Sequence, residues 1–214
     1  MGRYVTEAIG TFFLVFTIGM VVTGEVAVAP LAIGSILMVM VYMGGHVSGA
    51  HYNPAVTVGV WLRGALPTKD VIPYIAAQIL GGWLAATVVQ LITGQTFAPA
   101  PGLGYGTGAV LLAEILMTFA LVLVILNVAT SPATAGNSYF GLAIGFTVGA
   151  GAFAVGGVSG GVFNPAVGIG PILVDSLMGT GSLANLWIYI VAPVLGGLAA
   201  VPVFKLQSAG IAPA

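Results

Sequence analysis

Residues 45–56 read GHVSGAHYNPAV, and residues 156–167, 111 positions further on, read GGVSGGVFNPAV. Eight of these twelve positions are identical. Each copy follows a long apolar run and contains glycines, then an Asn suited to cap a helix and a Pro suited to its first position, namely Asn53-Pro54 and Asn164-Pro165. In both places the pattern predicts a non-helical loop that leads directly into a short helix.

The composition indicates an integral membrane protein, with the lipid bilayer as its surroundings. Of the 214 residues, 59% are hydrophobic and 4% are charged, and the mean hydropathy is +1.14. A soluble domain could not cover its surface with so few polar groups. The net charge of -1, with only four cationic side chains, excludes a nucleic-acid-binding protein. Without cysteine, a metal-ligand spacing or a nucleophile–base pair, the chain is predicted to be no enzyme and to hold no metal or cofactor.

Hydropathy predicts an all-α membrane protein with six transmembrane helices and two re-entrant half-helices. The six segments long enough to cross about 30 Å of hydrocarbon are residues 4–24, 31–47, 70–93, 109–130, 138–156 and 183–205. The shorter apolar segments 54–62 and 165–173, at about 1.5 Å per residue, reach only half way.

The chain is interpreted as a duplication within one structural domain. The first repeat covers residues 1–93, a Gly- and Pro-rich linker covers 94–108, and the second repeat covers 109–214. Glu7, for example, recurs as Glu114. Since each repeat holds three spans, an odd number, the second is expected to lie inverted relative to the first. The two half-helices then meet near the middle of the membrane.

Charge placement predicts the orientation. Arg3, Arg63, Lys69 and Lys205 all fall on one side of a six-span arrangement. The positive-inside rule places that side, with both termini, in the cytoplasm. Short loops and tails favour a prokaryotic cell membrane.

Two glycine-rich loops at membrane depth predict a hydrated path. Irregular backbone is tolerated there only where it is buried in protein or lines a water-filled cavity. Two half-helix N-termini would meet at the centre, and their dipoles disfavour cations and excess protons. Asn53 and Asn164 can exchange hydrogen bonds with a neutral molecule, so the path is predicted to pass water and small uncharged solutes.

The paired motifs Asn53-Pro54-Ala55 and Asn164-Pro165-Ala166, each after a Ser-Gly step, resemble those of the aquaporin, or major intrinsic protein, family. The resemblance covers nearly the whole chain and includes Glu7 and Glu114. It implies an aquaporin-like right-handed bundle, a homotetramer, and a central constriction at the two Asn-Pro-Ala motifs. It also implies that the pore-lining carbonyls belong to Gly49, Ala50, His51, Tyr52, Gly160, Gly161, Val162 and Phe163.

Four side chains have alternative interpretations. Glu7 and Glu114 are predicted to support the loops by accepting bonds from backbone N–H groups, since a proton relay would need more titratable partners than the chain offers. His46 and His51 are predicted to brace the first loop by hydrogen bonds. A pH gate or an ammonia relay is the alternative for these histidines.

The filter positions depart from the usual pattern of the family. The family usually has an Arg three residues after the second Asn, where this chain has Val167, and its other filter positions correspond to Ile33, Ala152 and Gly161. A wider, more apolar opening is therefore predicted. Some plant vacuolar members also carry Val there, which implies passage of urea, ammonia or hydrogen peroxide besides water. Gly168 does not match the Asp that glycerol facilitators usually have at that position.

The resulting functional hypothesis is a passive channel for water and small uncharged solutes, namely urea, ammonia, glycerol or hydrogen peroxide. A strictly water-selective aquaporin is the first alternative. A coupled secondary transporter is a second, although the chain has few buried charges for coupling ions. A non-conducting structural membrane protein is a third.

Overall fold

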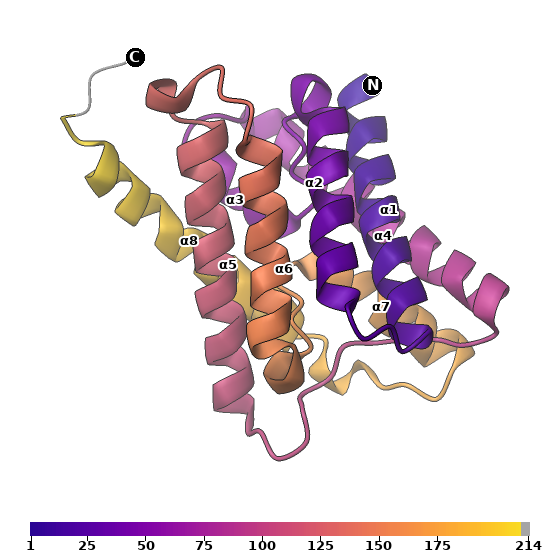
Figure 1. Ribbon diagram of the computed structural model, residues 1–214. Coiled ribbons are helices and arrows are strands. Elements are labelled where there is room, and N and C mark those ends of the chain that lie inside the picture. Colours follow the sequence, from indigo (N-terminus) through magenta and orange to yellow (C-terminus); the bar gives the residue numbers. More distant parts are fainter. Residues whose placement is uncertain (211–214) are drawn as a thin grey trace.

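The protein is a bundle of eight α-helices in the computed structural model, which describes residues 1–210 (Figure 1). No β-strand occurs in that range. The helices are α1 Gly2–Thr23, α2 Ala29–Ser48, α3 Pro54–Leu62, α4 Thr68–Thr93, α5 Thr107–Ala129, α6 Phe140–Ser159, α7 Pro165–Met178 and α8 Ile188–Ser208. Six of the helical segments are long and apolar enough to cross a membrane, as predicted. α3 and α7 are the two short, re-entrant helices.

The end of α7 and the start of α8 differ most from the bounds predicted. α7 continues to Met178, beyond residue 173, because residues 174–178 contain no glycine or proline and the next glycine is Gly179. α3, in contrast, ends at Leu62, and Gly64 follows with a φ of +87°, which glycine adopts without strain. α8 begins at Ile188 rather than 183, because a short 3₁₀ turn, Leu183–Asn185, precedes it.

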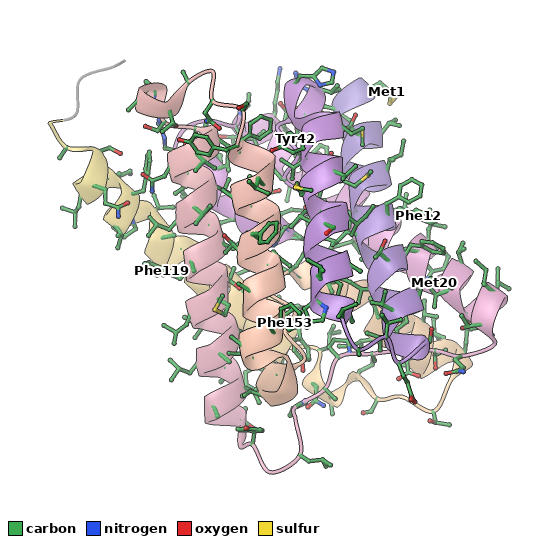
Figure 2. All side chains as sticks on the ribbon, viewed as in Figure 1. Met1, Phe12, Met20, Tyr42, Phe119 and Phe153 are labelled. Atoms are coloured by element: carbon green, nitrogen blue, oxygen red, sulfur yellow. The ribbon has the colours of Figure 1, made fainter. Side chains whose placement is uncertain are left out.

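The helices pack in the same pattern in the two predicted repeats. α1 packs against α4 as α5 packs against α8, and α2 packs against α6 where the two repeats meet. Each half-helix packs against a span of the other repeat: α3 against α8, and α7 against α4. Figure 2 shows Phe12 and Phe119, which occupy equivalent positions, on opposite flanks of the bundle. Because each half-helix packs against a span of the other predicted repeat, the two halves of the chain form a single packed unit.

Glycines allow this close approach of half-helix and span. A Cβ at Gly82 in α4 would lie 2.8 Å from the Ala166 carbonyl oxygen in α7. A Cβ at the equivalent Gly197 in α8 would lie 2.9 Å from the Ala55 carbonyl oxygen in α3. Small residues permit such contacts between membrane helices, so both half-helices pack backbone to backbone against their spans.

Gly145 lies in a contact between α2 and α6 that leaves no room for a larger side chain. A Cβ there would collide with the Gly34 carbonyl oxygen and would lie 2.7 Å from the Met38 Cβ. Gly145→Ala is expected to destabilise the protein by about 1–3 kcal/mol, because the two helices must move apart. Thermal unfolding in detergent measures this loss. Gly157→Ala, on the same helix with nothing within 4 Å of a Cβ, is the control and should leave the midpoint unchanged or higher. Equal midpoints for both variants would contradict the argument.

Candidate functional site

The two glycine-rich loops have the same backbone path. α2 ends at Gly49 and α6 ends at Gly160, each with a φ of +86°. Further along each loop, Tyr52 (φ +49°) and Phe163 (φ +51°) also adopt the left-handed conformation, which is uncommon for a bulky side chain. Such strain persists only where the surroundings hold the backbone in place. Two buried carboxylates supply that restraint.

Glu7 in α1 holds the first loop. Its Oε1 accepts hydrogen bonds from Ser48 Oγ (2.7 Å) and the His51 backbone N–H (3.0 Å). Its Oε2 accepts from the Tyr52 backbone N–H (2.7 Å) and from Gln78 Nε2 (2.8 Å). The carboxylate is fully buried, so these four donors replace the water that it lacks.

Glu114 in α5 holds the second loop in the equivalent way. Its Oε1 accepts from Ser159 Oγ (2.7 Å) and the Val162 N–H (2.9 Å), and its Oε2 accepts from the Phe163 N–H (2.6 Å). It is also fully buried. Both glutamates therefore accept hydrogen bonds from backbone N–H groups of the adjoining loop.

The two motif asparagines join the loops to each other. Each Oδ1 caps its own half-helix: Asn53 accepts from the Ala55 N–H and Asn164 accepts from the Ala166 N–H, both at 2.9 Å. Each Nδ2 donates across to the opposite loop, from Asn53 to the Phe163 carbonyl (2.8 Å) and from Asn164 to the Tyr52 carbonyl (2.9 Å). The N-termini of α3 and α7 therefore lie close together, and their dipoles converge.

The rest of each motif starts its half-helix. Pro54 and Pro165 occupy the first helical position, where a missing N–H costs nothing. Ala55 and Ala166 are fully buried, because their backbones contact Gly197 and Gly82.

One cavity of about 240 Å³, room for several water molecules, passes this junction. Both motif asparagines line it, as do all four predicted filter positions, Ile33, Ala152, Gly161 and Val167. Of the residues whose carbonyls were predicted to line the pore, this cavity is lined by Ala50, His51, Tyr52, Gly160, Gly161, Val162 and Phe163. Gly49 instead lines a second cavity, of about 460 Å³, formed with residues 128–137. Ile144 borders both cavities.

A comparison of the sequence with protein families completes these observations. The profile described as Major intrinsic protein matches residues 1–204. The chain belongs to the major intrinsic protein family.

Relatives of known name agree with this assignment. This major intrinsic protein is 38% identical to a probable aquaporin NIP-type of Nicotiana alata, over 95% of this chain and 77% of the relative. It is 35% identical to the probable aquaporin AqpM of Archaeoglobus fulgidus, over 92% and 93% of the two chains. It is 37% identical to the glycerol uptake facilitator protein-like 6 of Lactiplantibacillus plantarum, over 94% and 95%.

The fold is also that of a solved member. The structure of the aquaglyceroporin from Plasmodium falciparum matches with a TM-score of 0.83 over 99% of this chain and 96% of that one, at 22% identity. Members of the family are channels and not enzymes, so this major intrinsic protein is a multi-pass membrane protein and a passive channel for water and small solutes. The predictions of family and fold are confirmed. Within the described residues, no three His, Asp or Glu side chains converge in a way that could hold a metal ion.

The structure of this major intrinsic protein differs from the sequence-based expectation at His46. That side chain is exposed at the end of α2 and makes no hydrogen bond to any of residues 1–210, so the predicted bracing role is wrong. The loop is supported instead by Tyr74, whose hydroxyl donates to the Ser48 carbonyl (2.8 Å), and by Gln78. Both lie on α4, and Tyr74 is 26 residues away from Ser48, so no local pattern indicates the contact.

Proposed function

We propose that this channel passes urea, ammonia, glycerol or hydrogen peroxide in addition to water. The observation that supports the proposal is the character of the four filter positions. Ile33, Ala152, Gly161 and Val167 border one cavity, and none of them carries a charge or a polar side chain. An apolar opening places no fixed donor in the path, so exclusion there depends on size alone. The similarity to the glycerol uptake facilitator protein-like 6 of Lactiplantibacillus plantarum supports the same range of solutes.

A permeability panel on purified protein tests this proposal. Proteoliposomes are mixed with sucrose, urea or glycerol in a stopped-flow instrument, and light scattering follows shrinkage and reswelling. We expect reswelling by urea and by glycerol well above that of protein-free vesicles. Fast shrinkage without any solute reswelling would instead support the strictly water-selective alternative.

The same channel is proposed to exclude protons and ions at the asparagine pair. Support comes from the convergence of two half-helix N-termini, each equivalent to roughly half a positive charge, beside the buried Asn53 and Asn164. A cation that arrives there would lose its hydration shell and meet positive potential. A neutral molecule meets amide donors that it can bond.

Asn53→Asp is expected to weaken this exclusion. The aspartate still caps α3, but it adds a negative charge and removes the donor to the Phe163 carbonyl. Planar bilayers under voltage clamp should show a cation current that is absent from the unmodified protein. Asn185→Asp, which makes the same change in charge on the 3₁₀ turn away from the cavity, is the control. An Asn53→Asp channel that conducts water but no current would refute the dipole account.

Orientation and assembly are also proposed. Arg3 pairs with Asp70 beside Lys69, and the Arg63 guanidinium lies 5.1 Å from the centre of the Phe204 ring, beside Lys205. Figure 1 shows the start of α1 and the end of α8 at the same end of the bundle. We infer that this end, with both termini, faces the cytoplasm of a prokaryotic cell, and that four copies form a homotetramer. Protease protection in oriented vesicles and the mass of the detergent-solubilised particle test these two points.

A further inference from the structure

The linker between the two predicted repeats borders the cavity that contains the predicted filter positions. Phe97, Ala98, Pro99 and Ala100 line that cavity, and none of them lies in a helix. A segment of this kind has no helical hydrogen bonds of its own, so contacts with neighbouring elements must hold it in place. Those contacts therefore determine how much room the linker leaves at this end of the cavity.

One end of the linker is attached to α6 and to the second glycine-rich loop. The Gly102 backbone N–H donates to the Val158 carbonyl at 2.9 Å. A Cβ at Gly160 would lie 3.3 Å from the Pro99 Cβ. Gly160 directly precedes Gly161, one of the predicted filter positions. A movement of the linker here would change the space beside the filter.

The other end of the linker is attached to α7 through Asp175. The Thr96 hydroxyl donates to Asp175 Oδ1 at 2.6 Å, and 79 positions of sequence separate the two residues. A hydroxyl bonded to a carboxylate at this distance forms a hydrogen bond about twice as strong as one between neutral groups. The next residue, Phe97, is buried against α1, where a Cβ at Gly19 would collide with its ring.

The turn after α7 surrounds the Asp175 carboxylate. A Cβ at Gly179 would collide with Asp175 Oδ1 and with the Thr96 hydroxyl oxygen, and a Cβ at Gly181 would collide with Asp175 Oδ2. The backbone N–H groups of both glycines donate to the Asp175 carbonyl, at 2.9 and 3.3 Å. The position of the carboxylate is therefore fixed by the turn that carries it.

The stability of α7 does not account for Asp175. The residue lies in the last turn of the helix, where the negative end of the helix dipole disfavours an anion. No cation offsets its charge within residues 1–210, because the one salt bridge there joins Arg3 to Asp70. Among the same residues, its side chain forms a single hydrogen bond, the one from Thr96. The contacts of the carboxylate thus indicate that it holds the linker.

We propose that the bond between Thr96 and Asp175 sets the width of the filter end of the channel, and that Asp175 is a positioning residue for solute selectivity. In the described part of the chain, Asp175 does not border the cavity, so it acts through residues 97–100. Without this bond, the linker is held by the Phe97 ring and at Gly102, and it occupies positions farther from the cavity. A wider opening favours glycerol and urea more than water, which needs less room. The inference rests on the proposed function, because it takes this end of the channel to select between solutes.

Thr96→Val and Thr96→Ser form a matched pair that tests this bond. Val has nearly the shape of Thr but no hydroxyl, whereas Ser retains the donor to Asp175. Stopped-flow light scattering on one batch of proteoliposomes for each variant gives the ratio of glycerol or urea permeability to water permeability. This ratio does not depend on how much folded protein the vesicles contain. We expect it to rise about threefold in Thr96→Val and to stay within about 1.5-fold of the unmodified value in Thr96→Ser.

Asp175→Ala removes the acceptor of the same bond. The permeability ratio should rise as it does in Thr96→Val, and the double variant should match the single variants, because all three lack one and the same interaction. Glu25→Gln, which removes a charge from an exposed position between α1 and α2, is the control and should leave the ratio unchanged. A double variant whose ratio rises by the product of the two single effects would overturn the proposal.

An unchanged ratio in Thr96→Val, or an equal rise in Thr96→Val and Thr96→Ser, would also overturn it. Failure of the proposed function is a different result, namely an unmodified protein that admits neither glycerol nor urea. In that case, passage of either solute through Thr96→Val but not through Thr96→Ser would still support the role of the bond. If Asp175→Ala fails to fold, the Thr96 pair decides.

Discussion

Glu114→Leu is expected to abolish the folded channel rather than to reduce its conductance. The carboxylate accepts three hydrogen bonds, from Ser159 Oγ and from the backbone N–H groups of Val162 and Phe163. Leu accepts none, and each donor left unpaired in a buried site costs about 1–3 kcal/mol. The sum is comparable to the whole stability of a typical domain, about 5–15 kcal/mol. Phe163 would also lose the restraint that holds its left-handed conformation.

The loss of the folded channel is measured by expression yield, by the elution profile of the detergent-solubilised protein and by thermal unfolding. Glu114→Gln should lie between the unmodified protein and Glu114→Leu, because its amide retains one acceptor oxygen but not two. Glu25→Gln removes a charge from an exposed position between α1 and α2 and serves as the control. A Glu114→Leu protein that unfolds within a few degrees of the unmodified one would show that the second loop holds its conformation without the carboxylate.

The sequence predicted those features that depend on local pattern. The repeated motif contains its own capping residue and first-turn proline, so it determined where α3 and α7 begin, and hydropathy placed the six spans. The end of α7 was predicted too early, because the prediction weighed apolar length and did not weigh the absence of glycine and proline from residues 174–178.

Contacts between distant segments could not be predicted in this way. Residues 97–100, in the linker between the repeats, line the main cavity beside the filter positions. Phe97 also lies against Gly19 in α1, at a position that only a glycine leaves free. The hydrogen bonds from Asn53 to Phe163 and from Asn164 to Tyr52 likewise join residues more than 100 positions apart. Such pairings depend on how the two repeats pack, and one sequence without its fold does not specify them.

The apolar filter leads to the second large expected effect. Val167 lies in the first turn of α7, is 6% exposed, and borders the cavity with Ile33 and Ala152. Val167→Arg extends a long cationic side chain with several N–H donors into that cavity. The opening becomes narrower and gains fixed donors. Glycerol and urea need more width than water does, so the free-energy barrier should rise more for these solutes.

The expected result is a fall of at least about tenfold in glycerol and urea permeability, equivalent to about 1.4 kcal/mol in barrier height, with water permeability reduced less than about threefold. Stopped-flow light scattering on one batch of proteoliposomes gives both values. Val167→Met is the control, because it lengthens the side chain without adding a charge or hydrogen-bond donors. It therefore separates the effect of a narrower opening from the effect of the guanidinium group. If Met and Arg lower solute passage equally, width alone sets the selection. Equal losses of water and of solutes in Val167→Arg would mean that the constriction that selects between them lies elsewhere along the cavity, and the proposed solute range would lose its structural basis.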